Sequence, residues 1–146
     1  MPKSPNQKLK LLYLMQILLQ RTDENHPMTV AEMISALAAN DISAERKSIY
    51  DDLEALRLFG LDVVQVKGKN TVYYIGSRDF ELPELKLLVD AVQACRFITR
   101  RKSDALIRKL ESQASVHQAR QLQRQVYVSG RVKAMNESIY YNVDTI

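Results

Sequence analysis

A short basic segment at residues 43–50 holds the side chains best suited to recognise another molecule. It reads Ser-Ala-Glu-Arg-Lys-Ser-Ile-Tyr, with Arg46 and Lys47 side by side. An arginine can bind the O6 and N7 atoms of guanine through two hydrogen bonds, and a lysine can bind guanine or a phosphate. Tyr50, about one helical turn further on, can contact a phosphate or a thymine methyl. This pattern favours a contact with nucleic acid.

A second basic group follows at residues 67–70, Lys-Gly-Lys-Asn, between two β-rich runs. The turn residues place Lys67, Lys69 and Asn70 at the tip of a hairpin, where they suit contacts to a DNA backbone or minor groove. The candidate DNA-binding residues are therefore Ser43, Arg46, Lys47, Tyr50, Lys67, Lys69 and Asn70.

The other reactive residue types offer no chemistry for an enzyme. The chain has one cysteine and two histidines, too few for a disulfide or a zinc site built from Cys and His. The adjacent Asp51 and Asp52 diverge by about 100° on a helix and cannot face one substrate together. No glycine-rich phosphate loop is present. We expect no enzyme activity, no metal and no cofactor.

Charge alone gives weak guidance. The chain has 146 residues and a net charge of +4. Residues 1–76 hold nine Lys/Arg and nine Asp/Glu, whereas residues 77–146 hold twelve and eight, which accounts for the whole excess. If the N-terminal half binds DNA, the local placement of its charges must be responsible. No secretory signal or membrane-length apolar run occurs, so we expect a cytoplasmic protein.

Three predicted helices position the basic segment, over residues 8–21, 30–39 and 44–59. Thr29 and Glu32 have the spacing of a capping box for the second helix. Ser43 is the predicted N-cap of the third helix, and Gly60 ends it. Along this third helix, apolar residues at helical spacing predict one packed face and leave a polar face free; they are Ile49, Leu53 and Leu56.

The β-branched runs at 62–66 and 71–75 predict a hairpin. Three helices followed by a hairpin indicate a winged helix-turn-helix. The expected fold is therefore mainly α with a small β-hairpin, and residues 1–76 are the predicted DNA-binding domain. The helix at 44–59 is expected to lie in the major groove and the tip at 67–70 on the backbone.

Residues 77–146 are predicted to form a helical linker region through which the chain dimerises. A helix is expected from Leu82 to Ile98, with Cys95 buried as a small apolar residue. Ser103 is the predicted cap of a helix over 104–112, and the basic run Arg100–Lys102 before it is favoured as a solvated loop over an extra DNA contact. Further predictions are a short helix at 115–123, an extended segment near 125–129 and a last helix from residue 138.

The segment from Ser43 to Leu56, with Gly60 and Leu61 after it, resembles the helix-turn-helix of DeoR-type regulators. More narrowly, the chain resembles the N-terminal region of WYL-domain transcriptional regulators. The linker segments that carry this narrower resemblance are Phe80–Ala94, Gln125–Val128 and Asn136–Asn142.

This resemblance implies a DNA-binding transcriptional regulator that pairs with a second copy of itself on double-stranded DNA. It does not extend to the WYL domain itself, because residue 146 comes before the point where such a domain would begin. The effector is therefore unknown, and no membrane partner is expected. An alternative is a winged-helix module that binds other proteins and has no affinity for DNA.

Overall fold

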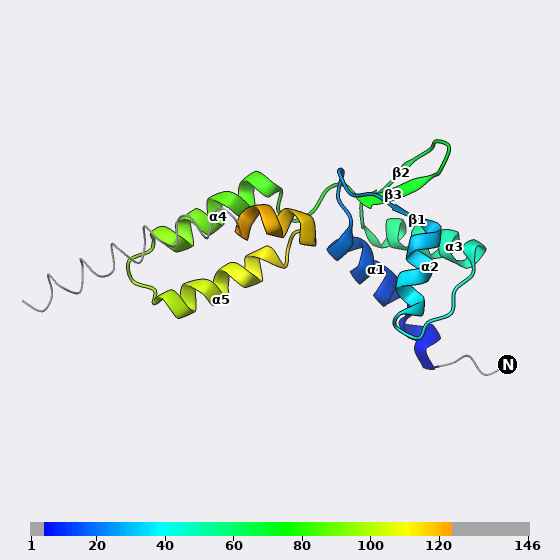
Figure 1. Cartoon of the computed structure of the whole chain (residues 1–146), viewed down its shortest axis with the longest axis horizontal. Helices are drawn as coiled ribbons and strands as arrows, with labels where there is room; N and C mark the ends of the chain where they lie inside the picture. The colour runs from blue at the N-terminus through cyan, green and yellow to red at the C-terminus, as the bar shows by residue number, and fades with distance from the viewer. Residues whose placement is uncertain (1–4, 124–146) are drawn as a thin grey trace, which may run out of the picture. The chain divides into compact units, whose positions relative to one another are not determined.

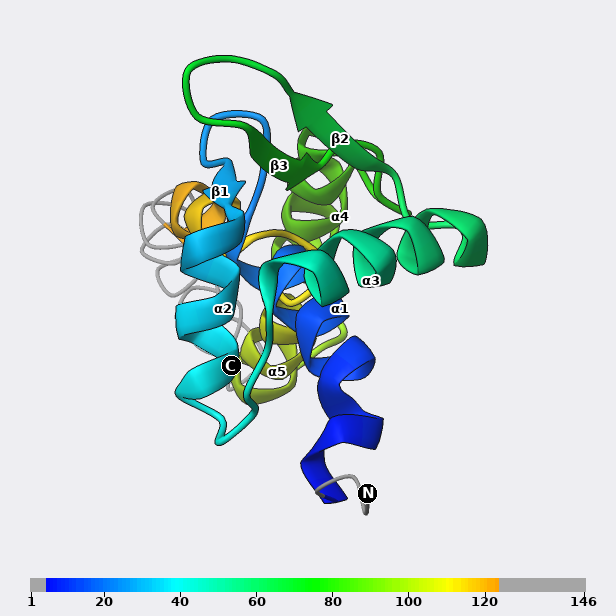
Figure 2. The same ribbon diagram turned by 90° about the vertical axis from the view of Figure 1, so that its right-hand side faces the viewer.

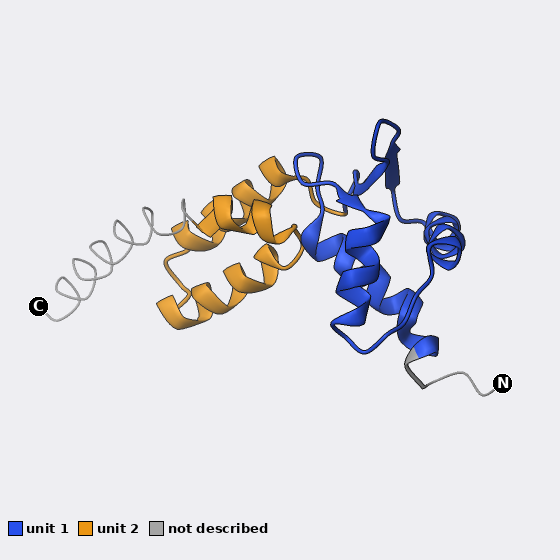
Figure 3. Cartoon of the chain, turned by 45° about the vertical axis from the view of Figure 1, so that its right-hand side comes forward, with its two compact units in different colours: residues 1–78 blue, residues 79–146 orange. Residues whose placement is uncertain are grey.

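The computed structural model describes residues 5–123, which are mainly helical with one small antiparallel sheet. This confirms the predicted mainly α composition with a small β component. The chain divides into two compact units, Met1–Arg78 and Asp79–Ile146 (Figure 3). The elements labelled in Figure 1 are η1 (Pro5–Leu9), α1 (Lys10–Arg21), β1 (Met28–Thr29), α2 (Val30–Ala38), α3 (Arg46–Phe59), β2 (Val63–Val66), β3 (Val72–Ile75), α4 (Leu82–Ala94) and α5 (Arg100–Glu111).

Unit 1 packs α1, α2 and α3 around one apolar core, to which the sheet also contributes. The predicted stripe of α3 is buried, with exposed fractions of 0–2% for Ile49, Leu53 and Leu56. Burying these three side chains fixes which face of α3 turns outward. The remaining buried members of the core are Leu14, Ile17, Leu18, Met28, Val30, Met33, Ala36, Leu37, Ile42, Val63, Tyr73 and Ile75.

The capping prediction for α2 is confirmed. The Thr29 hydroxyl accepts a hydrogen bond from the backbone N–H of Glu32, and the Glu32 carboxylate accepts one from the Thr29 N–H. These bonds satisfy donors that the helix itself leaves unpaired.

The predicted start of α3 is wrong by two residues. The helix begins at Arg46 with Glu45 as its N-cap, and no side chain caps it. Ser43 lies in the preceding extended segment, where its backbone oxygen accepts a hydrogen bond from Gln7 Nε2 at 2.9 Å. This contact spans 36 residues along the chain, so the local pattern could not reveal it. The predicted end is confirmed, since Gly60 follows the helix with a φ of +126°.

The hairpin is confirmed and belongs to a sheet of three strands in the order β1-β3-β2. Strands β2 and β3 pair antiparallel, with Val63 opposite Ile75 and Gln65 opposite Tyr73. The sequence analysis missed β1, which is two residues long and pairs Met28 with Tyr73. Figure 2 shows the β2–β3 hairpin above α3.

Unit 2 contains α4, α5 and a further helix over residues 116–123. Helices α4 and α5 pack against each other. Its core is smaller than that of unit 1, with Leu85, Ala114 and Leu122 buried and Leu82 and Leu110 packed against them.

Three predictions for unit 2 are corrected. Helix α4 ends at Ala94, and Cys95 is its C-cap, half-buried and outside the helix. Helix α5 is capped by Thr99, whose hydroxyl accepts from the N–H of Lys102 at 3.2 Å, whereas Ser103 is buried inside the helix. The run Arg100–Lys102 is therefore the exposed first turn of α5 and no loop.

The predicted segments near 125–129 and from residue 138 lie outside the described residues. Within residues 5–123, no helix is both long enough and apolar enough to span a membrane.

Candidate nucleic-acid interface

The outward face of α3 begins with two exposed cations, Arg46 and Lys47, in its first turn. Tyr50 follows one turn later and is 44% exposed. The Arg46 Nη1 atom donates to the Tyr50 hydroxyl oxygen at 3.4 Å. Because no other described residue pairs with the charge of Arg46 or Lys47, both remain available to a ligand.

Two of the acidic residues of α3 are compensated by cations within unit 1. Asp52 turns toward α1 and pairs with Lys10, with 2.5 Å between Asp52 Oδ2 and Lys10 Nζ. Glu54 pairs with Arg57 at 3.1 Å, one turn further along α3. Asp51 is exposed and has no such cation among the described residues. The N-terminal turn of α3 is therefore the part most favourable to an anion.

Lys10 is a charged residue among the leucines of α1. The structure buries it to 8% exposure, where its ammonium group also donates to the Ser48 hydroxyl. A lysine spaced among leucines gave no signal of this partner, because Asp52 is 42 residues further along the chain.

The hairpin tip, between β2 and β3, is separate from the first turn of α3. Residues 67–70 are all exposed. Within the described part of the chain, no hydrogen bond or ion pair joins Lys67, Lys69 or Asn70 to the basic turn of α3. The structure therefore presents the predicted residues on two separate projections of one unit, while Ser43 lies exposed just before α3.

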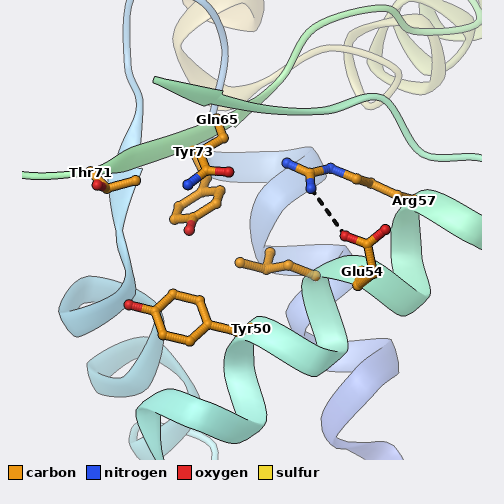
Figure 4. Close-up of a pocket in the computed structure, with 7 residues that line it drawn as sticks. Tyr50, Glu54, Arg57, Gln65, Thr71 and Tyr73 are labelled. Carbon is orange, nitrogen blue, oxygen red and sulfur yellow. Dashed lines mark hydrogen bonds and ion pairs between the residues drawn. The ribbon is translucent and has the colours of Figure 1, made fainter. Parts of the chain in front are cut away.

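A polar cleft of about 290 Å³ lies between these two projections (Figure 4). Residues of α3 at the spacing i, i+3, i+4 and i+7 form one wall, because that spacing places them on one face of a helix. Alternate residues of the hairpin form the other wall, because they share one face of the sheet. The lining residues are Tyr50, Leu53, Glu54, Arg57, Gln65, Thr71 and Tyr73.

Arg57 stabilises this cleft from the α3 side. Its Nε donates to the backbone oxygen of Val63 at 3.0 Å, and its Nη1 donates to Glu54 (Figure 4). The guanidinium group therefore ties α3 to the start of β2 and neutralises the carboxylate beside it. The sequence analysis had assigned no role to Arg57.

Tyr73 contributes a buried phenol at the base of the cleft, and only 3% of the residue is exposed. Burial raises the pKa of this phenol, as does the nearby Tyr50, while Arg57 and Arg46 act in the opposite direction. Alternation along β3 turns Tyr73 inward, whereas the next residue, Tyr74, is half-buried on the other face. The place of Tyr73 in a cleft was not foreseen, since this depends on the pairing of β3 with two other strands.

No metal centre forms in the described part of the chain, where no three His, Cys, Asp or Glu residues are grouped. No protein-family model matches the chain, and no match was found among curated proteins or solved structures.

Proposed function

We propose that this chain is a DNA-binding transcriptional regulator whose residues 1–76 act as a winged helix-turn-helix. In this proposal α3 lies in the major groove, with Arg46 and Lys47 at base edges or phosphates. The hairpin tip, with Lys67, Lys69 and Asn70, contacts the backbone of the same duplex. Ser43, just before the helix, contacts a phosphate near Tyr50.

The observation that carries the proposal is the distribution of charge along α3. Both cations of its first turn are exposed and lack an acidic partner among the described residues, whereas Asp52 and Glu54 each have a cation. The free N–H groups at a helix start add to the attraction for a phosphate. The resemblance of Ser43–Leu61 to DeoR-type regulators, and of the linker to WYL-domain regulators, supports the same function.

We further propose that the regulator acts as a homodimer through residues 77–146. Unit 2 exposes large apolar side chains, with Leu87 70% and Phe97 96% exposed. Such surfaces favour association. A dimer would place two copies of α3 on paired half-sites, which is how many helix-turn-helix proteins bind.

The alternative is a module that binds another protein. It is favoured by Leu58 and Phe59 at the C-terminal end of α3, which are 83% and 78% exposed. A partner that covered this end of the helix would need no affinity for DNA.

Fluorescence anisotropy separates the two functions. A labelled duplex from upstream of the protein's own gene is titrated with the chain at several salt concentrations, beside a duplex of scrambled sequence. We expect tighter binding to the upstream duplex and a steady loss of affinity as salt rises, because bound cations release counterions from DNA. No binding to either duplex at low salt would favour the protein-binding alternative.

Three variants then locate the interface. Arg46→Ala is expected to reduce the preference for the upstream duplex, whereas Lys69→Ala weakens binding to both duplexes alike and lowers the salt slope by about one. Arg101→Ala is the charge-matched control, since Arg101 is exposed on α5 in the other unit. If all three variants lose the same affinity, general charge attraction explains the binding and the assigned interface is wrong.

A further inference from the structure

The two proposed DNA contacts lie on either side of the cleft between α3 and the hairpin. If α3 enters the major groove and the hairpin tip reaches the backbone or minor groove, the boundary between those grooves must pass between them. In duplex DNA that boundary is a sugar-phosphate strand. The cleft therefore faces a backbone phosphate, so its lining can be tested for phosphate chemistry.

The lining carries no net charge, because Glu54 and Arg57 pair at 3.1 Å on one wall. The other lining residues include uncharged donors, among them the hydroxyls of Tyr50, Thr71 and Tyr73. Hydroxyl and amide groups of this kind are common partners of DNA phosphates.

The Tyr73 hydroxyl points from the sheet toward α3 and into the cleft (Figure 4). The residue as a whole is 97% buried, but its hydroxyl is not among the described buried polar atoms that lack a partner, and it opens into the cleft. Like any tyrosine near neutral pH, this phenol is protonated and can donate a hydrogen bond. An acceptor oxygen that enters the cleft can therefore take a hydrogen bond from this hydroxyl.

Tyr50 can take part without losing its contact to the basic turn. Its oxygen accepts a hydrogen bond from Arg46, so the hydroxyl proton is still available for donation. A phosphate bound there would fix Tyr50, and Tyr50 in turn would orient the guanidinium group of Arg46 toward the groove.

We propose that the cleft between α3 and the hairpin holds one backbone phosphate of bound DNA, which accepts hydrogen bonds from Tyr50, Thr71 and Tyr73. This inference rests on the proposed DNA-binding function. It adds to the proposed interface a phosphate contact that is made by neutral donors and does not depend on the DNA sequence.

The test uses a duplex that the 146-residue chain selects from a random-sequence pool. Tyr73→Phe and Thr71→Val each remove one hydroxyl and keep most of the side-chain shape. We expect each to bind the selected duplex about 10-fold more weakly, the loss typical of one hydrogen bond to a charged group. The salt slope should not change, because neutral donors release no counterions. Selection with either variant should return the same preferred sequence.

Tyr74→Phe is the matched control. Tyr74 is the next residue of β3, and successive side chains of a strand point to opposite faces of the sheet. It therefore loses the same hydroxyl away from the cleft and should bind like the wild type. Thermal unfolding of the three variants and the wild type at the same temperature verifies that differences in binding do not come from unfolding.

Replacing phosphates of the duplex one at a time by methylphosphonate locates the partner. For the wild type, one replacement near each bound α3 should weaken binding about 10-fold. The same replacement should cause little further loss in Tyr73→Phe, because the interaction is already absent.

The outcomes separate the two proposals. If the wild type binds duplex DNA but Tyr73→Phe and Thr71→Val bind equally well, the phosphate assignment is wrong while the proposed function stands. A changed sequence preference in these variants would also overturn it, since the hydroxyls would then read bases. If the wild type binds no duplex, the proposed function fails and this inference fails with it.

Discussion

Lys10 shows how a single residue determines which charges α3 presents. Its ammonium group lies between Ser48 and Asp52 on the side of α3 that faces α1. The contact links α1 to the first two turns of α3 and compensates a carboxylate that would otherwise repel a phosphate. The side chains of Lys10 and Asp52 are 10% and 21% exposed, so water screens this pair less than a surface pair.

Lys10→Met is expected to lower the free energy of unfolding by about 1–3 kcal/mol, since it leaves Asp52 partly buried without its cation. Lys8→Met is the control, because Lys8 is exposed in η1 and carries the same charge two residues earlier. Urea denaturation of both variants gives the comparison. Equal midpoints for Lys10→Met and Lys8→Met would mean that the buried pair contributes no net stability.

The phenol of Tyr73 should titrate later than an ordinary tyrosine, since burial raises its pKa above the usual 10.0. The folded protein then holds this proton at a pH where the unfolded chain has released it. Stability from this group is complete below pH 10.0 and falls as the pH rises further.

Tyrosinate absorbance, measured for the wild type and for Tyr73→Phe, isolates this group by difference. We expect the midpoint of the difference curve to lie above pH 10.0, and the alkaline loss of stability to be smaller in Tyr73→Phe. A difference curve centred at or below the ordinary value would show that the phenol is not buried as the structure places it.

At the scale of elements, the sequence predicted what short-range chemistry determines. The capping box of Thr29 and Glu32, the buried stripe of α3 and the stop at Gly60 each depend on residues within one or two turns. The start of α3 and strand β1 were not predicted, because they depend on distant partners: Gln7 binds Ser43 and Tyr73 pairs with Met28.

The candidate site also has one part that short-range sequence patterns predict and one part that depends on distant contacts. The exposed cations Arg46 and Lys47 follow from the helical pattern, so their position on the free face was predictable. The cleft was not, because the register that places Gln65 opposite Tyr73 and above α3 is a tertiary property. The available signal of a cleft was Gln65, a polar residue on the same face of β2 as the buried Val63.

The base of the hairpin depends on Gly76. A methyl group there would lie 2.6 Å from Asp62 Oδ2 and 2.9 Å from Val64 Cγ2. The same Asp62 oxygen accepts a hydrogen bond from the Ser77 N–H at 2.7 Å, so moving the carboxylate would lose that bond. Close approach of the chain therefore requires glycine at this position.

Gly76→Ala is expected to lower the free energy of unfolding by about 1–3 kcal/mol, as overpacking usually does. Gly68→Ala is the matched control at the hairpin tip, where the nearest atom to an added methyl is Asn70 O at an ordinary 3.8 Å. Thermal unfolding gives the melting temperatures of Gly76→Ala and Gly68→Ala for comparison. Similar melting temperatures would mean that the strands adjust at no cost.

At the scale of the whole molecule, the two units differ in their described cores and in the apolar side chains that they expose. Unit 1 has a core of three helices and a sheet, and it contains every residue assigned to the DNA interface. The described core of unit 2 is small, while Leu87 and Phe97 remain exposed. This contrast supports a division of work in which the first unit binds DNA and the second associates with another copy.

A fragment of residues 1–78 tests this division. Because the core of unit 1 draws only on its own residues, we expect the fragment to unfold in one cooperative transition. The fragment should sediment as a monomer and bind a single half-site. The full chain should sediment as a dimer and bind paired half-sites more tightly, because binding of the second half-site is then intramolecular. Sedimentation velocity and anisotropy on duplexes with one or two half-sites give both readouts. A dimeric fragment would place the association surface in unit 1 and assign the exposed Leu58 and Phe59 of α3 as its first candidates.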